Sequence, residues 1–373
     1  MSIRTTGVGG GQKRAKWRPF SKAATLLVAW LERVDPGTHR RIKGLRLVTA
    51  YGIAAMLGAV LEPHQAGIGG ALSSLAGGFA LWASVSEGQA TRAASSRDLL
   101  ILCAAAAVGA VSMIGIGAML GLGAWLRPEA ALITGAFLVG YLKRFGTLGA
   151  GVGSQIYIGQ LLAYCAALHL ADIATAVLAG VIAAVAAIVP RVLSGPAERP
   201  VSLPISGPLE LVSPAQGSRE LRMGLQAALA AFIIVLLSAL FHLEESAWAI
   251  TACTYVIGAS AADTLDRVRR RILGTLVGVP LGLMLMPVAA HASLALWLAA
   301  ALAMVVYAMA LPERYDVACG AYAFTLMVML TATGERSTQL LAARAWETLL
   351  GGAIGLTAAV LVLPLRPQRK TST

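Results

Sequence analysis

Long uncharged runs alternate with short charged segments along the whole chain. The clearest runs are Met223–Leu243, Ile173–Pro190, Ser246–Ala262, Val317–Gly334 and Thr348–Leu365. About 20 apolar residues, rising 1.5 Å each, cross a hydrocarbon core of roughly 30 Å. Inside a bilayer, each backbone donor and acceptor must be satisfied within its own segment. The runs therefore predict membrane-spanning helices.

The pattern predicts about twelve such helices in 373 residues. We expect them near residues 45–61, 67–86, 98–120, 128–142, 149–170, 172–192, 221–242, 245–262, 271–288, 293–311, 315–333 and 340–365. The helix at 128–142 is expected to be short or tilted, because Glu129 and Lys143 bound its uncharged stretch closely. An even number of crossings places both termini on one side of the membrane.

Composition agrees with a membrane protein of the all-α class. The chain is 57% hydrophobic and 13% charged, whereas soluble domains carry roughly 25% charged residues. The four cysteines lie inside predicted helices without the paired spacing of a metal site. We therefore expect no disulfide, no bound metal and no cofactor.

The net charge of +12 would suggest nucleic acid as a partner in a soluble protein, but its distribution indicates a membrane. Of the 30 Lys and Arg residues, 27 lie on the side that the helix plan makes cytoplasmic. This asymmetry follows the positive-inside rule. It predicts a bacterial inner-membrane protein with both termini in the cytoplasm, in contact with anionic lipids and not with nucleic acid.

The chain divides at a stretch rich in Pro, Ser and Gly. The predicted parts are a basic cytoplasmic segment 1–44, a first membrane half 45–192, a cytoplasmic linker 193–220, a second membrane half 221–365 and a cytoplasmic tail 366–373. Arg46 and Arg222 open the two halves, and Arg144 and Arg314 lie in matching turns. These landmarks predict two parallel six-helix repeats, related by an axis along the membrane normal.

Glycines mark surfaces where helices pack closely. Gly274, Gly278 and Gly282 recur every four residues on one predicted helix, and Gly115 and Gly351 begin similar stripes. Small residues at this spacing let helix backbones approach each other. We therefore assign Gly274, Gly278 and Gly282 to helix packing.

Three segments of the second half form a recognisable set: Glu245-Ser-Ala-Trp248-Ala-Ile-Thr251-Ala252, Arg271-Ile-Leu-Gly274-Thr275-Leu-Val-Gly278 and Arg344-Ala-Trp346-Glu347-Thr348-Leu-Leu-Gly351. They resemble the membrane module of fusaric acid resistance and aromatic acid exporter proteins, over roughly residues 219–366. The first half matches in helix plan only, because no Gly-Thr pair follows Arg97-Asp98. The resemblance implies efflux of aromatic or other organic acids, driven by an ion gradient.

A substrate path can be hypothesised from these segments and from the charges near them. Arg271 ends a dense basic turn and could attract an organic anion, although a role in topology and lipid contact is the alternative. Arg314 has Asp316 beside it and could instead form a salt-bridged turn. The hypothesised path consists of Arg271, Thr275, Arg314, Arg344, Glu347, Trp248 and Thr251.

Two other classes of function compete with an exporter. An organic-anion channel would share the six-helix module. A membrane-lipid enzyme could use Asp263 and Asp266, but such sites need a second facing acidic cluster, which the sequence lacks. No nucleophile motif or phosphate loop is present, so we expect no catalytic residues and no enzyme activity. Homo-oligomer formation is compatible with this class of protein.

Overall fold

The computed structural model describes residues 35, 38–62, 70–89, 91–121, 127–194, 214–241, 243, 246–285, 287, 292–311, 313–332 and 338–362. Residues 1–40 and 41–373 form two compact units. All helices of the described part lie in the second unit, except the first two residues of α2. The described residues contain helices and no strand, as the uncharged runs predict.

A helix overlaps each range predicted for the first half. The elements are α2 (His39–Leu61), α3 (Ala71–Ser86), α4 (Arg92–Gly121), the 3-10 helix η1 (Pro128–Ala131), α5 (Leu132–Tyr141), η2 (Leu142–Phe145), α6 (Gly146–Cys165), η3 (Leu170–Asp172) and α7 (Ile173–Leu193). The short helix expected after Pro128 is α5. Its 10 residues extend only about 15 Å.

The second half follows the predicted ranges with one clear exception. Its helices are α8 (Pro214–Phe241), α9 (Ser246–Val256), α10 (Ala261–Leu283), α12 (Ser293–Ala310), α13 (Tyr315–Ala332) and α14 (Thr338–Leu361). The linker between the halves lies largely outside the described residues.

The exception is the start of α10, where the sequence predicts a turn before Arg271. The helix begins ten residues earlier because the Ser260 hydroxyl caps it, accepting a hydrogen bond from the Asp263 backbone N–H at 3.1 Å. Arg270 then pairs with Asp266 at 2.8 Å, one turn apart. The basic segment is therefore the first half of a helix, and the prediction of a turn was wrong.

Four helices are long and apolar enough to cross a membrane: His39–Leu61, Arg92–Leu120, Leu170–Leu193 and Arg219–Phe241. Other apolar helices of the described part are shorter, and α9 has 11 residues, about 17 Å. Such a helix does not cross a core of roughly 30 Å alone. The chain is thus a multi-pass membrane protein, but the predicted number of twelve crossings is not confirmed.

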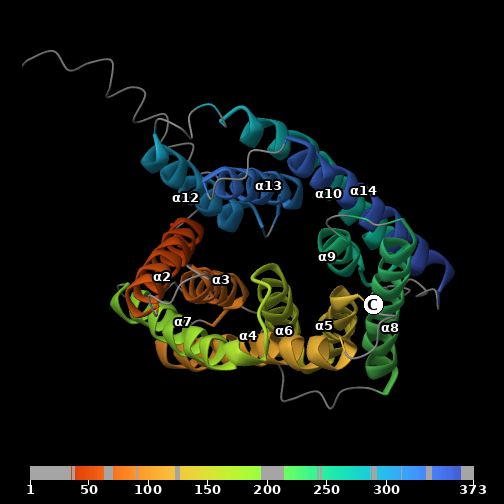
Figure 1. Cartoon of the computed structure of the whole chain (residues 1–373), viewed down its shortest axis with the longest axis horizontal. Coiled ribbons are helices and arrows are strands. Elements are labelled where there is room, and N and C mark those ends of the chain that lie inside the picture. The colour runs from red at the N-terminus through yellow and green to blue at the C-terminus, as the bar shows by residue number, and fades with distance from the viewer. Residues whose placement is uncertain are drawn as a thin grey trace, which may run out of the picture. The chain divides into compact units, whose positions relative to one another are not determined.

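The two halves pack in corresponding ways and meet along two seams. In the first half, α4 packs on α6 and α7, and α3 packs on α7; in the second half, α10 packs on α13 and α14, and α9 packs on α14. Between the halves, α5 packs on α8, and α2 approaches α12 at Gly44, where an added Cβ atom would lie 3.0 Å from Val305. Figure 1 shows both of these pairs side by side.

The glycine stripe of α10 lies against α13 and not between the halves. At Gly274 and Gly278 a Cβ atom would collide with the backbone of Gly320, and at Gly282 it would collide with Met327. The two helix backbones are therefore in direct contact. This contact holds α10 at a fixed distance from α13, and the residues between the glycines border a cavity.

Candidate functional site

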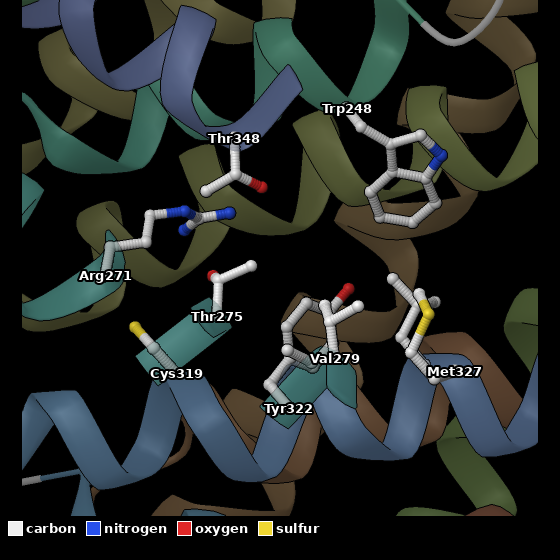
Figure 2. Close-up of a pocket in the computed structure, with 10 residues that line it drawn as sticks. Trp248, Arg271, Thr275, Val279, Cys319, Tyr322, Met327 and Thr348 are labelled. Atoms are coloured by element: carbon white, nitrogen blue, oxygen red, sulfur yellow. The ribbon is translucent and has the colours of Figure 1, made fainter. Parts of the chain in front are cut away.

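A cavity of about 40 Å³ lies between α9, α10, α13 and α14. Three residues of the hypothesised path line it: Trp248 from α9, and Arg271 and Thr275 from α10. The other lining residues are Val279, Cys319, Tyr322, Ala323, Leu326, Met327 and Thr348. Figure 2 shows the Arg271 and Thr348 side chains extending toward each other across it. The structure therefore brings together residues from all three sequence segments of the resemblance.

Arg271 places a cation at this cavity, and no carboxylate among the described residues lies against it. Its guanidinium donates a hydrogen bond to the Tyr315 hydroxyl, whereas its Nε atom is buried and has no acceptor. Within the part of the chain that the structure describes, no Asp or Glu forms an ion pair with Arg271. A desolvated charge without a counter-ion is costly. The cavity therefore favours an anionic ligand.

The volume of the cavity limits what it holds in this conformation. One water molecule needs about 10–15 Å³ of such space, so about 40 Å³ accommodates a few waters or a small ion. An organic acid with an aromatic ring does not fit. Binding such an acid would require the helices around the cavity to move apart.

Two other residues of the hypothesised path are buried outside the cavity. The Thr251 hydroxyl donates to the Ala247 carbonyl and accepts from the Tyr157 hydroxyl, each at 2.8 Å. Thr251 thus joins α9 to α6 of the first half. Glu347 is 3% exposed on α14, next to the cavity residue Thr348.

The remaining two residues of the path are not brought to the cavity by the described structure. Arg314 is exposed and forms a two-pronged pair with Asp316, with distances of 3.2 and 3.0 Å. The hydrogen bond from Arg314 lowers the pKa of the Asp316 carboxyl. This geometry is the salt-bridged turn that the sequence left as an alternative. Arg344 belongs to α14, but its side chain lies outside the described part.

Neutral polar residues on α6, which the sequence analysis did not single out, connect the halves. The Ser154 hydroxyl lies 2.8 Å from the Tyr255 hydroxyl, next to the bond between Tyr157 and Thr251. The Tyr157 and Tyr255 rings also meet edge to face, with centroids 5.8 Å apart. A search for hydroxyl and amide groups inside the uncharged runs would have found this helix, because such groups join helices in membranes.

A buried carboxylate, also missed from the sequence, ties the two halves together at the start of α5. Glu129 is 2% exposed and accepts hydrogen bonds from Ser238 at 3.0 Å and Ser246 at 3.1 Å. Arg127 adds an ion pair at 3.2 Å and donates to the Ser238 carbonyl. The second half supplies both serines, so this network and the α6 contacts hold the same seam.

A titratable group lies at the opposite end of α5, where η2 follows it. Burial lowers the pKa of the Lys143 amine to about 8, with Arg267 adding repulsion and Glu220 opposing the change. Arg144 stacks on the Tyr141 ring, with its guanidinium carbon 4.1 Å from the centroid. Arg267, the first arginine of the basic segment of α10, therefore lies near a cation of the first half.

The corresponding position of the first half has a different electrostatic environment. Arg97, which matches Arg271 in the sequence plan, is exposed and lies 3.7 Å from Asp98. The Arg97 charge is hydrated and has a carboxylate nearby, whereas none of the described carboxylates pairs with Arg271 at its cavity. The candidate anion site therefore belongs to the second half.

Comparison with known proteins matches the half that contains this cavity. A family model described as fusaric acid resistance protein-like matches residues 230–358. No curated protein and no solved structure is significantly similar to the chain. The matched region includes α9, α10, α12 and α13 in full, together with every residue that lines the cavity. The match confirms the resemblance read from the sequence, over residues 230–358.

Proposed function

We propose that this membrane protein is a secondary transporter that exports aromatic or other organic acids, driven by an ion gradient. The observation that carries the proposal is the Arg271 guanidinium at a cavity, where no described carboxylate neutralises it. An organic carboxylate would supply the missing counter-ion. The family match supports membrane transport, and the acid substrate follows from the charge of the site.

The direction of export rests on the charge asymmetry of the sequence. The 27 Lys and Arg residues on one side support an orientation in a bacterial inner membrane with both termini in the cytoplasm. In this orientation, the basic first half of α10 lies toward the cytoplasm. Acids that are anionic at cytoplasmic pH would be concentrated there by the positive potential.

A mechanism with two repeats is supported by the corresponding packing of the halves. The contacts of α4 with α6 and α7 match those of α10 with α13 and α14. Across the halves, α8 packs on α5 and α2 approaches α12 at Gly44. Repeats related in this way can rock against each other around a fixed site. The two seams would then be the places where the halves move.

The small size of the cavity is compatible with a transporter between its open states. A conducting channel needs a continuous polar path through the membrane. A cavity of about 40 Å³ is instead what a closed state of an alternating-access protein would contain. We propose neither an enzymatic activity nor a cofactor.

Deletion and re-expression of the gene test the proposed function. Cells that lack the protein should become sensitive to some acids in a panel of aromatic and aliphatic carboxylates, and re-expression should restore tolerance. The Arg271→Gln protein, produced at the same level, should not restore it. Equal tolerance of all strains to every acid in the panel would contradict organic-acid export.

A further inference from the structure

An aromatic cluster joins the two halves next to the Arg271 cavity. It consists of Trp82 on α3, Tyr307 on α12 and Tyr322 on α13. The Trp82 ring meets Tyr322 edge to face, with centroids 5.4 Å apart, and meets Tyr307 in the same way at 6.0 Å. Trp82 and Tyr322 are only partly buried. The cluster therefore contributes ring surface from both halves at one place.

Tyr322 belongs to the cluster and also to the wall of the cavity. It lines the cavity together with Arg271 and Thr275, and Figure 2 shows it on α13 below the Arg271 side chain. The Tyr322 hydroxyl is also among the electrostatic neighbours of the Arg271 guanidinium. Tyr322 thus borders the cavity of the Arg271 cation and also contacts Trp82. If the cavity widened past Tyr322, it would reach the ring of Trp82.

The two seams between the halves differ in the groups that hold them. At the seam that contains α5 and α8, α6 also meets α9, where hydroxyl pairs at 2.8 Å join Tyr157 to Thr251 and Ser154 to Tyr255. At the seam that contains α2 and α12, α3 also meets α13, where the Trp82 and Tyr322 rings are in contact. Separating two hydroxyls in a dry site leaves polar groups unsatisfied. An aromatic ring can replace a ring contact without that cost, because edge-to-face geometry suits any aromatic partner.

We infer that Trp82 is a specificity-determining residue of the proposed site and binds the ring of an aromatic carboxylate whose charge pairs with Arg271. This inference rests on the proposed function and extends it to the first half of the chain. The ligand would enter at the aromatic cluster and take the place of the contact between Trp82 and Tyr322. The ring would then be held by one half, and its carboxylate by the other.

The test compares two acids of similar size, benzoate and cyclohexanecarboxylate, which differ in the aromaticity of the ring. Export of each is measured in membrane vesicles that contain the full chain, its Trp82→Leu variant or its Trp82→Phe variant. Edge-to-face contacts favour an aromatic partner by about 2- to 10-fold beyond simple burial. We expect Trp82→Leu to lose a preference of about this size for benzoate, because the aliphatic side chain removes the aromatic contact. Trp82→Phe should keep most of it.

The matched control is Trp297→Leu. Trp297 is 43% exposed on α12 and is outside both the cluster and the cavity. This variant should leave the ratio of the two export rates unchanged. If Trp82→Leu lowers both export rates by the same factor, Trp82 only packs the seam. If it changes neither rate, Trp82 is not part of the site. Either result overturns the inference while export itself stands. If the unmodified chain exports neither acid, the proposed function fails together with the inference.

Discussion

We expect the replacement Arg271→Gln to lower the rate of organic-acid export by about tenfold or more. The expected size follows from the loss of a hydrogen-bonded contact between charged groups, which contributes about 1.5–3 kcal/mol. Arg271 lines the cavity and has a buried Nε atom without an acceptor. Glutamine keeps hydrogen-bonding capacity but removes the charge that would attract a carboxylate. The measurement is the initial export rate in vesicles with equal amounts of inserted protein.

The matched control for this experiment is Arg269→Gln. Arg269 is exposed on the same basic segment of α10 and does not line the cavity. Both variants lose one positive charge from the same side, so an effect on membrane topology would be equal in both. We expect export by Arg269→Gln to fall by less than about twofold, as for an exposed charge. If both variants export equally well, Arg271 determines topology only and the candidate site is wrong.

A second large effect is expected from Gly278→Ala, at the contact between α10 and α13. An added methyl group would collide with the Gly320 backbone and lie 3.0 Å from the Ala323 Cβ atom. Since backbone cannot rotate away as a side chain can, the two helices must separate. Overpacking of this kind costs about 1–3 kcal/mol. We expect a lower thermal unfolding temperature of the purified protein, together with weaker export because Thr275 and Val279 move with the helix.

Gly117→Ala is the control, because a Cβ atom at Gly117 on α4 would meet nothing within 4 Å. Alanine also favours a helix over glycine by up to about 1 kcal/mol. The unfolding temperature of this variant should therefore stay the same or rise. A Gly278→Ala protein as stable as Gly117→Ala would contradict the close contact of α10 with α13.

The helices could be predicted from the sequence because long uncharged runs have one stable conformation in a membrane. The residues at which the helices end, and the number of helices that cross the membrane, could not be predicted. The segment before Arg271 is charged and was interpreted as a turn, but Ser260 and the pair Arg270–Asp266 make it helical. Likewise, the uncharged run that starts at Ser246 yields a helix of 11 residues, too short to cross alone.

The glycine pattern shows a similar limit of the sequence. Gly278 and Gly115 both belong to small-residue stripes, yet an added Cβ atom would collide with another backbone only at Gly278. The spacing of a stripe defines a helix face. Which neighbour covers this face, and how closely, depends on the tertiary packing.

The candidate site could be predicted in part. Trp248, Arg271 and Thr275 were assigned together from the resemblance, and all three line one cavity. Thr251 lies three residues after Trp248 on α9, but its hydroxyl forms a hydrogen bond with Tyr157 of the first half. The spacing of residues within one helix does not reveal this contact. Tyr322 was missed because the uncharged run around it contains no motif.

Active transport of an organic acid by the purified chain tests the central claim most directly. Proteoliposomes that contain the full-length protein would receive labelled benzoate, with proton and sodium gradients imposed in turn. We expect accumulation of benzoate above its external concentration with one of these gradients, loss of that accumulation when an ionophore collapses the gradient, and little accumulation with Arg271→Gln. Benzoate that only equilibrates across the membrane, at a rate independent of either gradient, would contradict a secondary transporter and indicate an anion channel.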